Sequence, residues 1–338
     1  MPAFSAKPFP YPTVNLKTGR GRADRLSLSE PTSLQLEFRS AAWLLGRPQL
    51  REGVDGVMDA VRDLPKLQGL LPLTGLDGGL NGRIGLGARG DSYYEYLLKQ
   101  WLLTNRTEER YLVAYQEAVR GIRKHLVKRT SRSGVAFISE ADARNCQKAD
   151  TACRVEPVTK MDHLVCFLPG LLALGYHRGA GGREDLELAE ELIVGCWLMY
   201  NTTATGIAPE ITQFDIAKGA KRDVWIKPHD TFSRLRPETV ESLFVLHRVT
   251  RKRVYRDWGA EIHQAIEKHA RVVTGGYAVI KNVDQVPVIH EDKMETFFLA
   301  ETLKYLFLLF SDDDVLPLDK YVFNTEAHPL EAFDPVGG

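Results

Sequence analysis

The sequence predicts an all-α fold made of about nine or ten helices in a single domain. Apolar residues recur at the spacing of a helix face through most of the 338 residues. Long connections rich in glycine and proline separate these segments, and such loops commonly carry function. One short extended segment near the C-terminus departs from the helical pattern.

The expected helices follow one another along the chain from residue 34 to residue 310. Apolar repeats cover one segment made of 34–38 together with 42–45, and then residues 54–64, 93–103, 111–126, 164–174, 186–199, 240–249, 255–272 and 294–310. Loops are expected at 70–90, 175–183 and 212–237, and short extended pieces at 135–138 and 277–280. No stretch has the composition of an interdomain linker, so residues 1–338 are predicted to form one domain.

The tail of the chain ends in an extended segment. Residues 321–324, Tyr-Val-Phe-Asn, alternate as in a strand, and the polar pair Thr325-Glu326 follows them. A helical domain that ends in a strand has to pack that strand against one of its own elements.

Composition excludes several classes of protein. The 44 basic and 44 acidic residues cancel and form no basic stripe, so we expect no nucleic-acid partner. The longest apolar run, residues 305–310, is far shorter than the roughly 20 residues of a membrane span. The N-terminus also lacks a charged region followed by an apolar stretch, so we expect no membrane segment and no targeting signal in this chain.

The cysteines and two sequons bear on the compartment. The four cysteines match no zinc-binding pattern. Cys146 and Cys153 flank a short polar loop that a disulfide could close, and free buried thiols are the equal alternative. Sequons begin at Asn105 and Asn201, and either could accept a glycan in a lumenal compartment.

Two glutamates stand where a solvated side chain is not expected. Glu301 lies in the apolar segment 294–310, and a glutamate is rarely buried unless it is paired or functional. A buried ion pair is the alternative for this residue. Glu238 follows Arg236-Pro237 at an expected helix start, where the helix dipole alone favours a carboxylate.

Three further polar residues carry alternatives of the same kind. Asp91 precedes an aromatic-rich helix that it could simply cap, but Arg89 two residues earlier makes the segment suitable for binding a sugar. Glu37 lies beside arginine residues with which it could pair. His163 opens an apolar helix, where a hydrogen-bonded core histidine is the common case.

The acidic residues together indicate a hydrolase. The chain combines carboxylates near helix ends or in apolar surroundings with no Cys/His cluster for a transition metal. That combination is typical of two-carboxylate hydrolysis with a hard cation such as Ca²⁺. The carboxylates are Glu37, Asp91, Glu238, Glu301 and Glu326.

Five segments resemble the signature segments of class I α-1,2-mannosidases, glycoside hydrolase family 47. In order, they are residues 87–100, 161–175, 235–244, 292–313 and 321–330. The resemblance runs from about residue 10 to the C-terminus, and residues 161–167 are closer to the endoplasmic-reticulum type than to the Golgi type. One departure is Gly90, where the family usually has alanine.

The resemblance implies a particular fold. The family fold is an (α/α)7 barrel, a toroid of inner and outer helices that a C-terminal β-hairpin plugs, and residues 321–324 would belong to this hairpin. The family domain begins upstream of Pro2, so the resemblance implies an incomplete barrel that is truncated on its N-terminal side. The absent part includes a Phe-Glu-Ser segment that supplies a further carboxylate for proton transfer.

The resemblance also implies roles for individual residues. Glu238 matches the base that activates water, and Asp91 matches a carboxylate implicated in protonating the leaving oxygen. Thr325 matches the residue that binds Ca²⁺ through its carbonyl and hydroxyl oxygens. Cys166 and Cys196 fit the family's disulfide. The positions that match the sugar pocket are Glu37, Arg89, His163, Arg236, Phe297, Glu301 and Glu326.

The implied activity is calcium-dependent, inverting hydrolysis of terminal α-1,2-linked mannose from high-mannose N-glycans on glycoproteins. Such a protein works as a monomer in the lumen of the secretory pathway, in N-glycan processing and glycoprotein quality control. For residues 1–338 alone we expect weak or no activity, because one proposed acid and several helices fall outside them. The alternatives are a mannose-binding quality-control module without turnover and an incomplete gene product.

Overall fold

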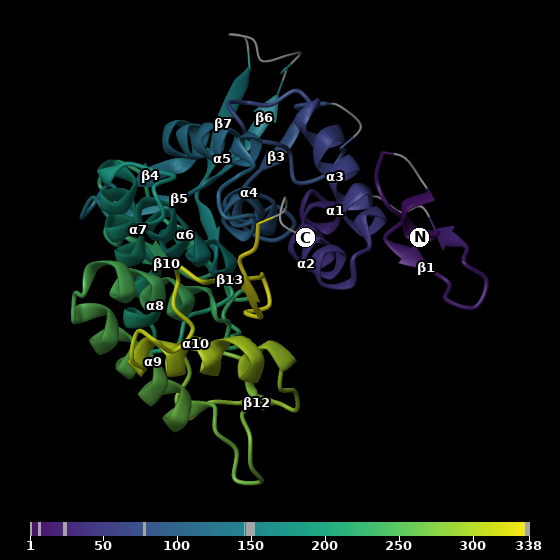
Figure 1. The fold of residues 1–338 in the computed structure, drawn as a ribbon. Helices are drawn as coiled ribbons and strands as arrows, with labels where there is room; N and C mark the ends of the chain where they lie inside the picture. The colour runs from purple at the N-terminus through teal and green to yellow at the C-terminus, as the bar shows by residue number, and fades with distance from the viewer. Residues whose placement is uncertain are drawn as a thin grey trace. The chain divides into compact units, whose positions relative to one another are not determined.

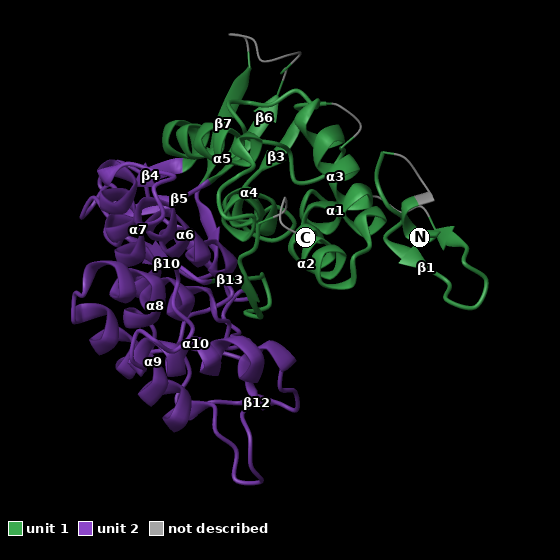
Figure 2. Ribbon diagram, viewed as in Figure 1, with its two compact units in different colours: residues 1–126, 140–158, 321–338 green, residues 127–139, 159–320 purple. Residues whose placement is uncertain are grey.

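The computed structural model describes residues 2–5, 8–22, 26–76, 79–144, 146 and 153–334, and helices are its main elements (Figure 1). The chain falls into two compact units (Figure 2). Unit 1 comprises residues 1–126, 140–158 and 321–338, and unit 2 comprises 127–139 and 159–320. The single domain expected from the sequence stays a prediction.

Unit 1 contains the first helices of the chain. They are α1 (Ser29–Thr32), α2 (Gln35–Leu45), α3 (Pro48–Arg62), α4 (Asp91–Leu103) and α5 (Glu109–Gly121), which runs on into a π-helical turn, Ile122–Leu126. Gly46 ends α2 in the left-handed conformation with φ +60°, and Pro48 starts α3 in the first helical turn. These helices confirm the four expected between residues 34 and 126.

The α4 helix is the core of unit 1. Every residue from Ser92 to Leu103 is buried, as expected for a helix that is apolar on nearly all faces. The charged pair inside α4 is satisfied internally, because Lys99 Nζ donates a hydrogen bond to Glu95 Oε1 over 2.6 Å.

The C-terminal tail forms the expected strand in unit 1. Strand β13 (Tyr321–Phe323) pairs antiparallel with β14 (Pro329–Glu331), and β13 packs against α4. Beyond the hairpin, the Phe333 N–H donates to the Leu103 carbonyl oxygen over 2.8 Å. The tail is therefore attached to the same helix at two places.

Unit 1 also contains a sheet that the sequence analysis did not predict. Strands β3 (Gly82–Ile84), β6 (Glu140–Arg144) and β7 (Arg154–Val158) are antiparallel in the order β3-β6-β7. Part of the expected loop at 70–90 is thus a strand. The remaining elements of unit 1 are a short 3₁₀ turn (Pro2–Ser5) and the two-residue strands β1 (Thr13–Val14) and β2 (Gly21–Arg22).

Charge pairing explains why the sheet escaped prediction. Arg83 on β3 pairs with Asp142 over 2.7 Å and with Glu140 over 2.6 Å, so ion pairs join these strands where apolar alternation would have been recognisable. A disulfide between Cys146 and Cys153 links the ends of β6 and β7 and decides against free thiols. The residues between these cysteines, 147–152, lie outside the described part of the chain.

Unit 2 contains the later helices. They are α6 (Leu168–His177), α7 (Arg183–Asn201), α8 (Glu238–Thr250), α9 (Val254–His269) and α10 (Lys304–Phe310). A 3₁₀ turn, His163–Phe167, leads into α6, and a π-helical turn, Phe298–Leu303, leads into α10. The α6 helix packs against both α7 and α8, and α8 packs against α9 and α10.

The disulfide implied for unit 2 is confirmed. Cys166 and Cys196 are bonded and link the 3₁₀ turn before α6 to α7. The apolar pattern predicts a helix to residue 272, three residues beyond the end of α9 at His269. The apolar run of 294–310 forms a regular α-helix only from Lys304 onward.

Short strands complete unit 2. Strands β8 (Lys160–Asp162), β9 (Ile211–Phe214) and β10 (Val224–Trp225) form an antiparallel sheet, and β9 and β10 lie in the region expected to be a loop. Two further pairs are β4 (Val127–Arg129) with β5 (Ala136–Ile138), and β11 (Val279–Ile280) with β12 (His290–Glu291). Strands β5 and β11 confirm the two extended pieces expected from the sequence.

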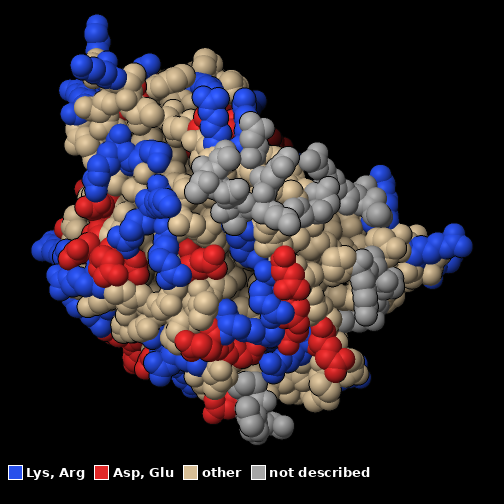
Figure 3. All heavy atoms as spheres, turned by 90° about the horizontal axis from the view of Figure 1, so that it is seen from above, with Lys and Arg blue, Asp and Glu red and all other residues tan. Residues whose placement is uncertain are grey.

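The helices and the surface charges have one general property each. Among the described residues, no helix is long and apolar enough to cross a membrane. Figure 3 shows patches of Lys and Arg next to patches of Asp and Glu on one face, in keeping with 44 residues of each sign.

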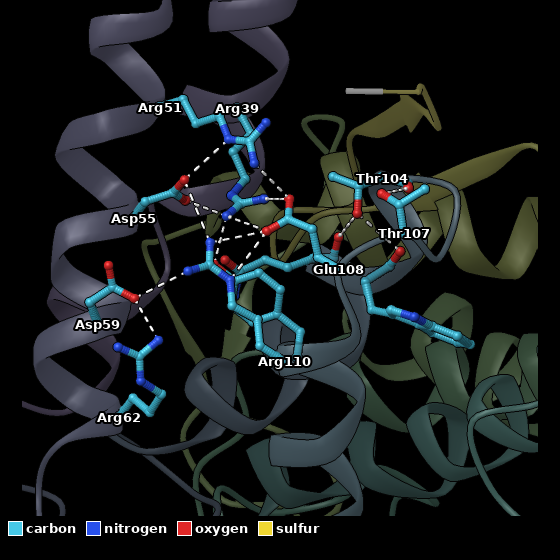
Figure 4. A network of polar contacts seen from close by, with 12 residues as sticks. Arg39, Arg51, Asp55, Asp59, Arg62, Thr104, Thr107, Glu108 and Arg110 are labelled. Carbon is cyan, nitrogen blue, oxygen red and sulfur yellow. Dashed lines mark hydrogen bonds and ion pairs between the residues drawn. The ribbon is translucent and has the colours of Figure 1, made fainter. Parts of the chain in front are cut away.

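A buried arginine connects three helices of unit 1 (Figure 4). Arg39 of α2 is 1% exposed and forms ion pairs with Asp55 of α3 and with Glu108, the residue before α5. Its guanidinium also donates a hydrogen bond to the Tyr111 hydroxyl over 2.6 Å. Arg110 contacts the same two carboxylates, so the network holds α2, α3 and α5 together.

We expect Arg39→Met to lower the free energy of unfolding by about 3 kcal/mol, because it leaves partly buried carboxylates without their central cation. The measurement compares the urea unfolding midpoint of the natural protein with that of the variant. The control is Arg62→Met, which removes an ion pair to Asp59 from a side chain that is 57% exposed and should cost less than about 1 kcal/mol. Equal costs for the two variants would contradict this account.

Candidate active site

The residues predicted for the site divide between the two units. Unit 1 contains Glu37, Arg89, Asp91, Thr325 and Glu326, and unit 2 contains His163, Arg236, Glu238, Phe297 and Glu301. The structure brings residues together within each group.

The turn between β13 and β14 carries Thr325 and Glu326, both exposed. Asn324 is 4% exposed and fixes this turn, because its Oδ1 accepts hydrogen bonds from the backbone N–H groups of Glu326 (3.0 Å) and His328 (2.8 Å). The sequence alone predicts no role for Asn324. Its position directly before Thr325 was the available signal.

Glu37 joins the hairpin turn to α4. Its Oε1 accepts hydrogen bonds from Asn324 Nδ2 (2.7 Å) and from the Tyr96 hydroxyl (3.0 Å). The Tyr96 hydroxyl in turn accepts a hydrogen bond from the Thr325 backbone N–H over 3.3 Å. Burial, with the nearby Glu37 charge, raises the pKa of Tyr96, so its hydroxyl keeps its proton.

The second carboxylate oxygen of Glu37 faces the interior. Glu37 Oε2 is buried and has no hydrogen-bond partner among the described residues. A buried carboxylate oxygen normally accepts a hydrogen bond, so this atom is suited to accept one from a ligand hydroxyl. The alternative that Glu37 pairs with an arginine is not what the described contacts show, since its partners are Tyr96 and Asn324.

Asp91 is the first residue of α4. Its Oδ1 accepts hydrogen bonds from the Ser29 hydroxyl (2.9 Å) and the Ser92 backbone N–H (2.8 Å). Arg89 is exposed and adopts φ +77°, and its carbonyl oxygen accepts a hydrogen bond from the Ser29 N–H over 2.9 Å. The loop before α4 and the start of α1 therefore hold Asp91 and Arg89 jointly.

Close packing explains the glycine at position 90, which occupies the N-cap position of α4. A Cβ atom on Gly90 would lie 2.4 Å from a methyl group of Leu73 and 2.6 Å from the carbonyl oxygen of Gly85. Both distances are well below van der Waals contact, so an alanine would force this loop to move.

The turn at Thr325 fits a hard cation. In the part of the chain that the structure describes, no hydrogen bond engages the hydroxyl or carbonyl oxygen of Thr325, and the residue is exposed. No group of three or more His, Cys, Asp or Glu residues among the described positions could hold a metal. Oxygen donors from one threonine, completed by water and ligand hydroxyls, suit Ca²⁺ and not a transition metal.

In unit 2, Glu238 and His163 form a direct contact. Glu238 is the first residue of α8 and is 9% exposed, and His163, at the start of the 3₁₀ turn, is 3% exposed. Glu238 Oε2 lies 2.7 Å from His163 Nδ1. The other ring nitrogen, Nε2, lies 2.7 Å from the Tyr200 hydroxyl and 3.2 Å from the Thr239 hydroxyl.

The charge of Glu238 follows from these contacts. Burial is the largest influence and raises the pKa of Glu238, but the hydrogen bond and charge of His163 and the charge of Arg236 together lower it below its ordinary value. Glu238 is therefore a carboxylate at neutral pH, able to accept a proton. The alternative that the helix dipole alone explains Glu238 leaves these side-chain contacts without a role.

Arg236 and Phe297 also lie together in unit 2. The Arg236 guanidinium carbon is 5.5 Å from the centre of the Phe297 ring, and its Nε donates a hydrogen bond to Glu210 Oε2 over 2.6 Å. Hydrogen-bond donors beside an aromatic face suit the hydroxyls and the apolar face of a sugar. Glu210 had no recognisable signal in the sequence.

Glu301 lies in the π-helical turn before α10. It is 7% exposed, as the apolar segment predicted. Its neighbour Thr302 donates a hydrogen bond from its hydroxyl to the carbonyl oxygen of Leu235, over 2.7 Å, and Leu235 adopts φ +59° just before Arg236. Single π-helical turns within helices occur frequently at functional sites.

The family description "Glycosyl hydrolase family 47" matches residues 1–332. The chain belongs to glycosyl hydrolase family 47. The human endoplasmic reticulum mannosyl-oligosaccharide 1,2-alpha-mannosidase is 46% identical, over 99% of this chain and 48% of that protein. Mannosyl-oligosaccharide 1,2-alpha-mannosidase MNS3 of Arabidopsis thaliana is 43% identical, over 97% of this chain and 57% of that protein. The family 47 chain thus spans about half the length of the curated relatives it matches.

A solved family member confirms the fold class. The alpha-1,2-mannosidase from Trichoderma reesei matches with a TM-score of 0.87 and 26% identity, over 98% of this chain and 72% of that one. The family 47 chain therefore has the helical (α/α)7-barrel class that the sequence predicts. The roles of the individual site residues stay predictions.

The pKa of Glu238 makes stability depend on pH. Because its pKa in the folded protein is below its ordinary value of 4.5, the ionised side chain stabilises the fold above pH 4.5. This stabilisation is lost as the pH falls through the lower folded value, at about 1.4 kcal/mol for each unit of depression.

We therefore expect the stability difference between the natural protein and Glu238→Gln, which cannot titrate, to decrease as the pH is lowered from 6 to 3, roughly across the ordinary range of a glutamate pKa. Urea unfolding of both proteins at several pH values measures this difference. A difference that is constant, or that grows toward low pH, would contradict a depressed pKa.

Proposed function

We propose that the protein containing this chain hydrolyses terminal α-1,2-linked mannose from high-mannose N-glycans on glycoproteins, with inversion and with Ca²⁺ as its cofactor. Membership of family 47 and the names of the relatives support the substrate class. The observation that carries the chemistry is the buried, ionised Glu238, which His163 holds at the start of α8.

Glu238 is the proposed general base. It accepts a proton from a water molecule as the water oxygen attacks the anomeric carbon, and the bond from that carbon to the leaving oxygen breaks. The depressed pKa keeps Glu238 ionised at neutral pH, and the contact to His163 fixes the direction of its carboxylate. Inversion requires the acid and the base to be about 6.5–9.5 Å apart, which leaves room for the water.

Asp91 is proposed to take part in protonating the leaving oxygen, as the family resemblance implies. The Ser29 hydroxyl and the Ser92 N–H restrict its carboxylate to one direction. Substrate contacts are proposed for the remaining polar residues and for Phe297, whose ring would pack on the sugar. These residues are Glu37, Arg89, His163, Arg236, Phe297, Glu301 and Glu326.

Thr325 is proposed to hold the calcium ion through its hydroxyl and carbonyl oxygens. When bound, the ion supplies a positive charge that attracts and orients sugar hydroxyls. The chain's own contribution is to present these oxygens in a fixed direction. Asn324 and Tyr96 do so by anchoring the turn to Glu37.

The test is mannose release by the natural protein from a high-mannose oligosaccharide, with Ca²⁺ and with a chelator. We expect calcium-dependent release of the inverted anomer, detected by NMR, and a loss of about 10³-fold or more in kcat for Glu238→Gln. Glu187→Gln, at a side chain that is 62% exposed, is the control and should retain activity.

Two outcomes would oppose this proposal. Without calcium-dependent release by the natural protein, the assignment fails. Oligosaccharide binding without release, unchanged by Glu238→Gln, would favour the mannose-binding quality-control module instead. Weak activity of residues 1–338 alone and a monomeric state both stay predictions.

We also propose the lumen of the secretory pathway as the compartment, supported by the name of the human relative and the disulfides.

Asn201 ends α7 and is exposed, so a glycan fits there. The Asn105 amide instead donates a hydrogen bond to Asp334 over 3.3 Å. We expect a peptide N-glycosidase to reduce the mass of the natural protein and of Asn105→Gln, but not of Asn201→Gln. A natural protein without any glycan would contradict this expectation.

A further inference from the structure

We infer that Tyr200 is a positioning residue for the proposed base Glu238 and acts through His163. The inference rests on the proposed function and extends it to a residue without an assigned role. Tyr200 is 4% exposed at the end of α7, and its hydroxyl lies 2.7 Å from His163 Nε2. The same ring places Nδ1 2.7 Å from Glu238 Oε2, so three buried side chains form one chain of hydrogen bonds.

The positions of the protons in these hydrogen bonds follow from Glu238 at one end and Tyr200 at the other. An ionised Glu238 can only accept a hydrogen bond, so the proton of the first contact belongs to His163 Nδ1. In the neutral ring Nε2 accepts a hydrogen bond from the Tyr200 hydroxyl, and in the charged ring Nε2–H donates to the Tyr200 oxygen, so the contact orients His163 in either form. Burial, together with the charges of Glu238 and Glu210, raises the pKa of Tyr200, so this hydroxyl keeps its proton.

Rigid contacts hold Tyr200 in place. The Trp197 ring stacks on the Tyr200 ring with 6.4 Å between centres, and Trp197 also stacks on Trp258 at 5.2 Å. The Cys166–Cys196 disulfide links the 3₁₀ turn that supplies His163 to the helix that supplies Tyr200. Both partners of the second hydrogen bond are therefore fixed to one covalently linked framework.

Removal of the Tyr200 hydroxyl would loosen the orientation of the His163 ring. Nε2 would keep only the Thr239 hydroxyl at 3.2 Å, so the ring would be free to leave the orientation that points Nδ1 at Glu238. The influences on the pKa of Glu238 are burial, which raises it, and His163, Arg236 and the residue's own backbone N–H, which lower it. A weaker contact to His163 leaves burial less opposed, which raises the pKa of Glu238.

The charged groups near Tyr200, His163 and Glu238 have hydrogen-bond partners of their own. Arg236, whose charge also influences Glu238, donates to Glu210 over 2.6 Å. Glu241, one turn further along α8, accepts a hydrogen bond from the Tyr305 hydroxyl over 3.3 Å. The effect of removing the Tyr200 hydroxyl should therefore reach Glu238 through His163.

The test is Tyr200→Phe in the natural protein, with kcat and KM for mannose release measured as functions of pH. We expect kcat to fall about tenfold while KM changes less than about twofold, because the base and not the sugar pocket is disturbed. The acidic limb of the kcat/KM profile should move to higher pH.

A matched control separates positioning from stability. Tyr255→Phe removes another buried hydroxyl of unit 2, one that donates to Glu190 over 3.1 Å, and should leave both the rate and the pH profile unchanged. Unchanged kcat and pH profile in Tyr200→Phe would overturn the inference. So would an equal fall in rate for both variants with no shift of the acidic limb.

A second measurement does not require activity. The ¹⁵N chemical shifts of the His163 imidazole report which ring nitrogen carries the proton. We expect a proton on Nδ1 in the natural protein and a changed distribution of protons between the two ring nitrogens in Tyr200→Phe. Identical spectra would overturn the inference even if no mannose is released, whereas a changed tautomer without any release would sink only the proposed function.

Discussion

The hydrogen bond between His163 and Glu238 is the contact on which the chemistry of unit 2 depends. A carboxylate that is 9% exposed would favour its neutral form, and a neutral acid cannot take a proton from water. His163 and Arg236 reverse this preference. Because Glu238 begins α8 while His163 begins the turn before α6, the packing of α6 against α8 determines whether the two side chains meet.

Unit 1 uses the same principle at its hairpin turn. Glu37 Oε1 is fixed by two donors from different elements, Tyr96 of α4 and Asn324 after β13, and Oε2 faces the interior without a partner among the described residues. In each unit a carboxylate, half-buried in Glu37 and buried in Glu238, is held at one oxygen by neighbours that are remote in sequence. Such prior orientation reduces the entropy that substrate binding has to overcome.

The sequence predicted the helices well because their apolar spacing is sustained over three turns or more, as in α4 and α7. It did not predict the strands β9 and β10, which have four and two residues and are too short for a clear period. Among the site residues, Glu301 could be singled out from its apolar surroundings alone. The role of Tyr200 could not, because its partner is 37 residues away and only the folded chain brings the two together.

The π-helical turn Phe298–Leu303 sets a limit on how this segment can vary between related proteins. A π turn contains one residue more than an α-helical turn, so a one-residue deletion would restore regular pitch and rotate the preceding backbone by about 100° about the helix axis. Phe297 would then point away from Arg236. Selection here should therefore act on segment length as strictly as on residue identity, and insertions or deletions should be rarer than substitutions.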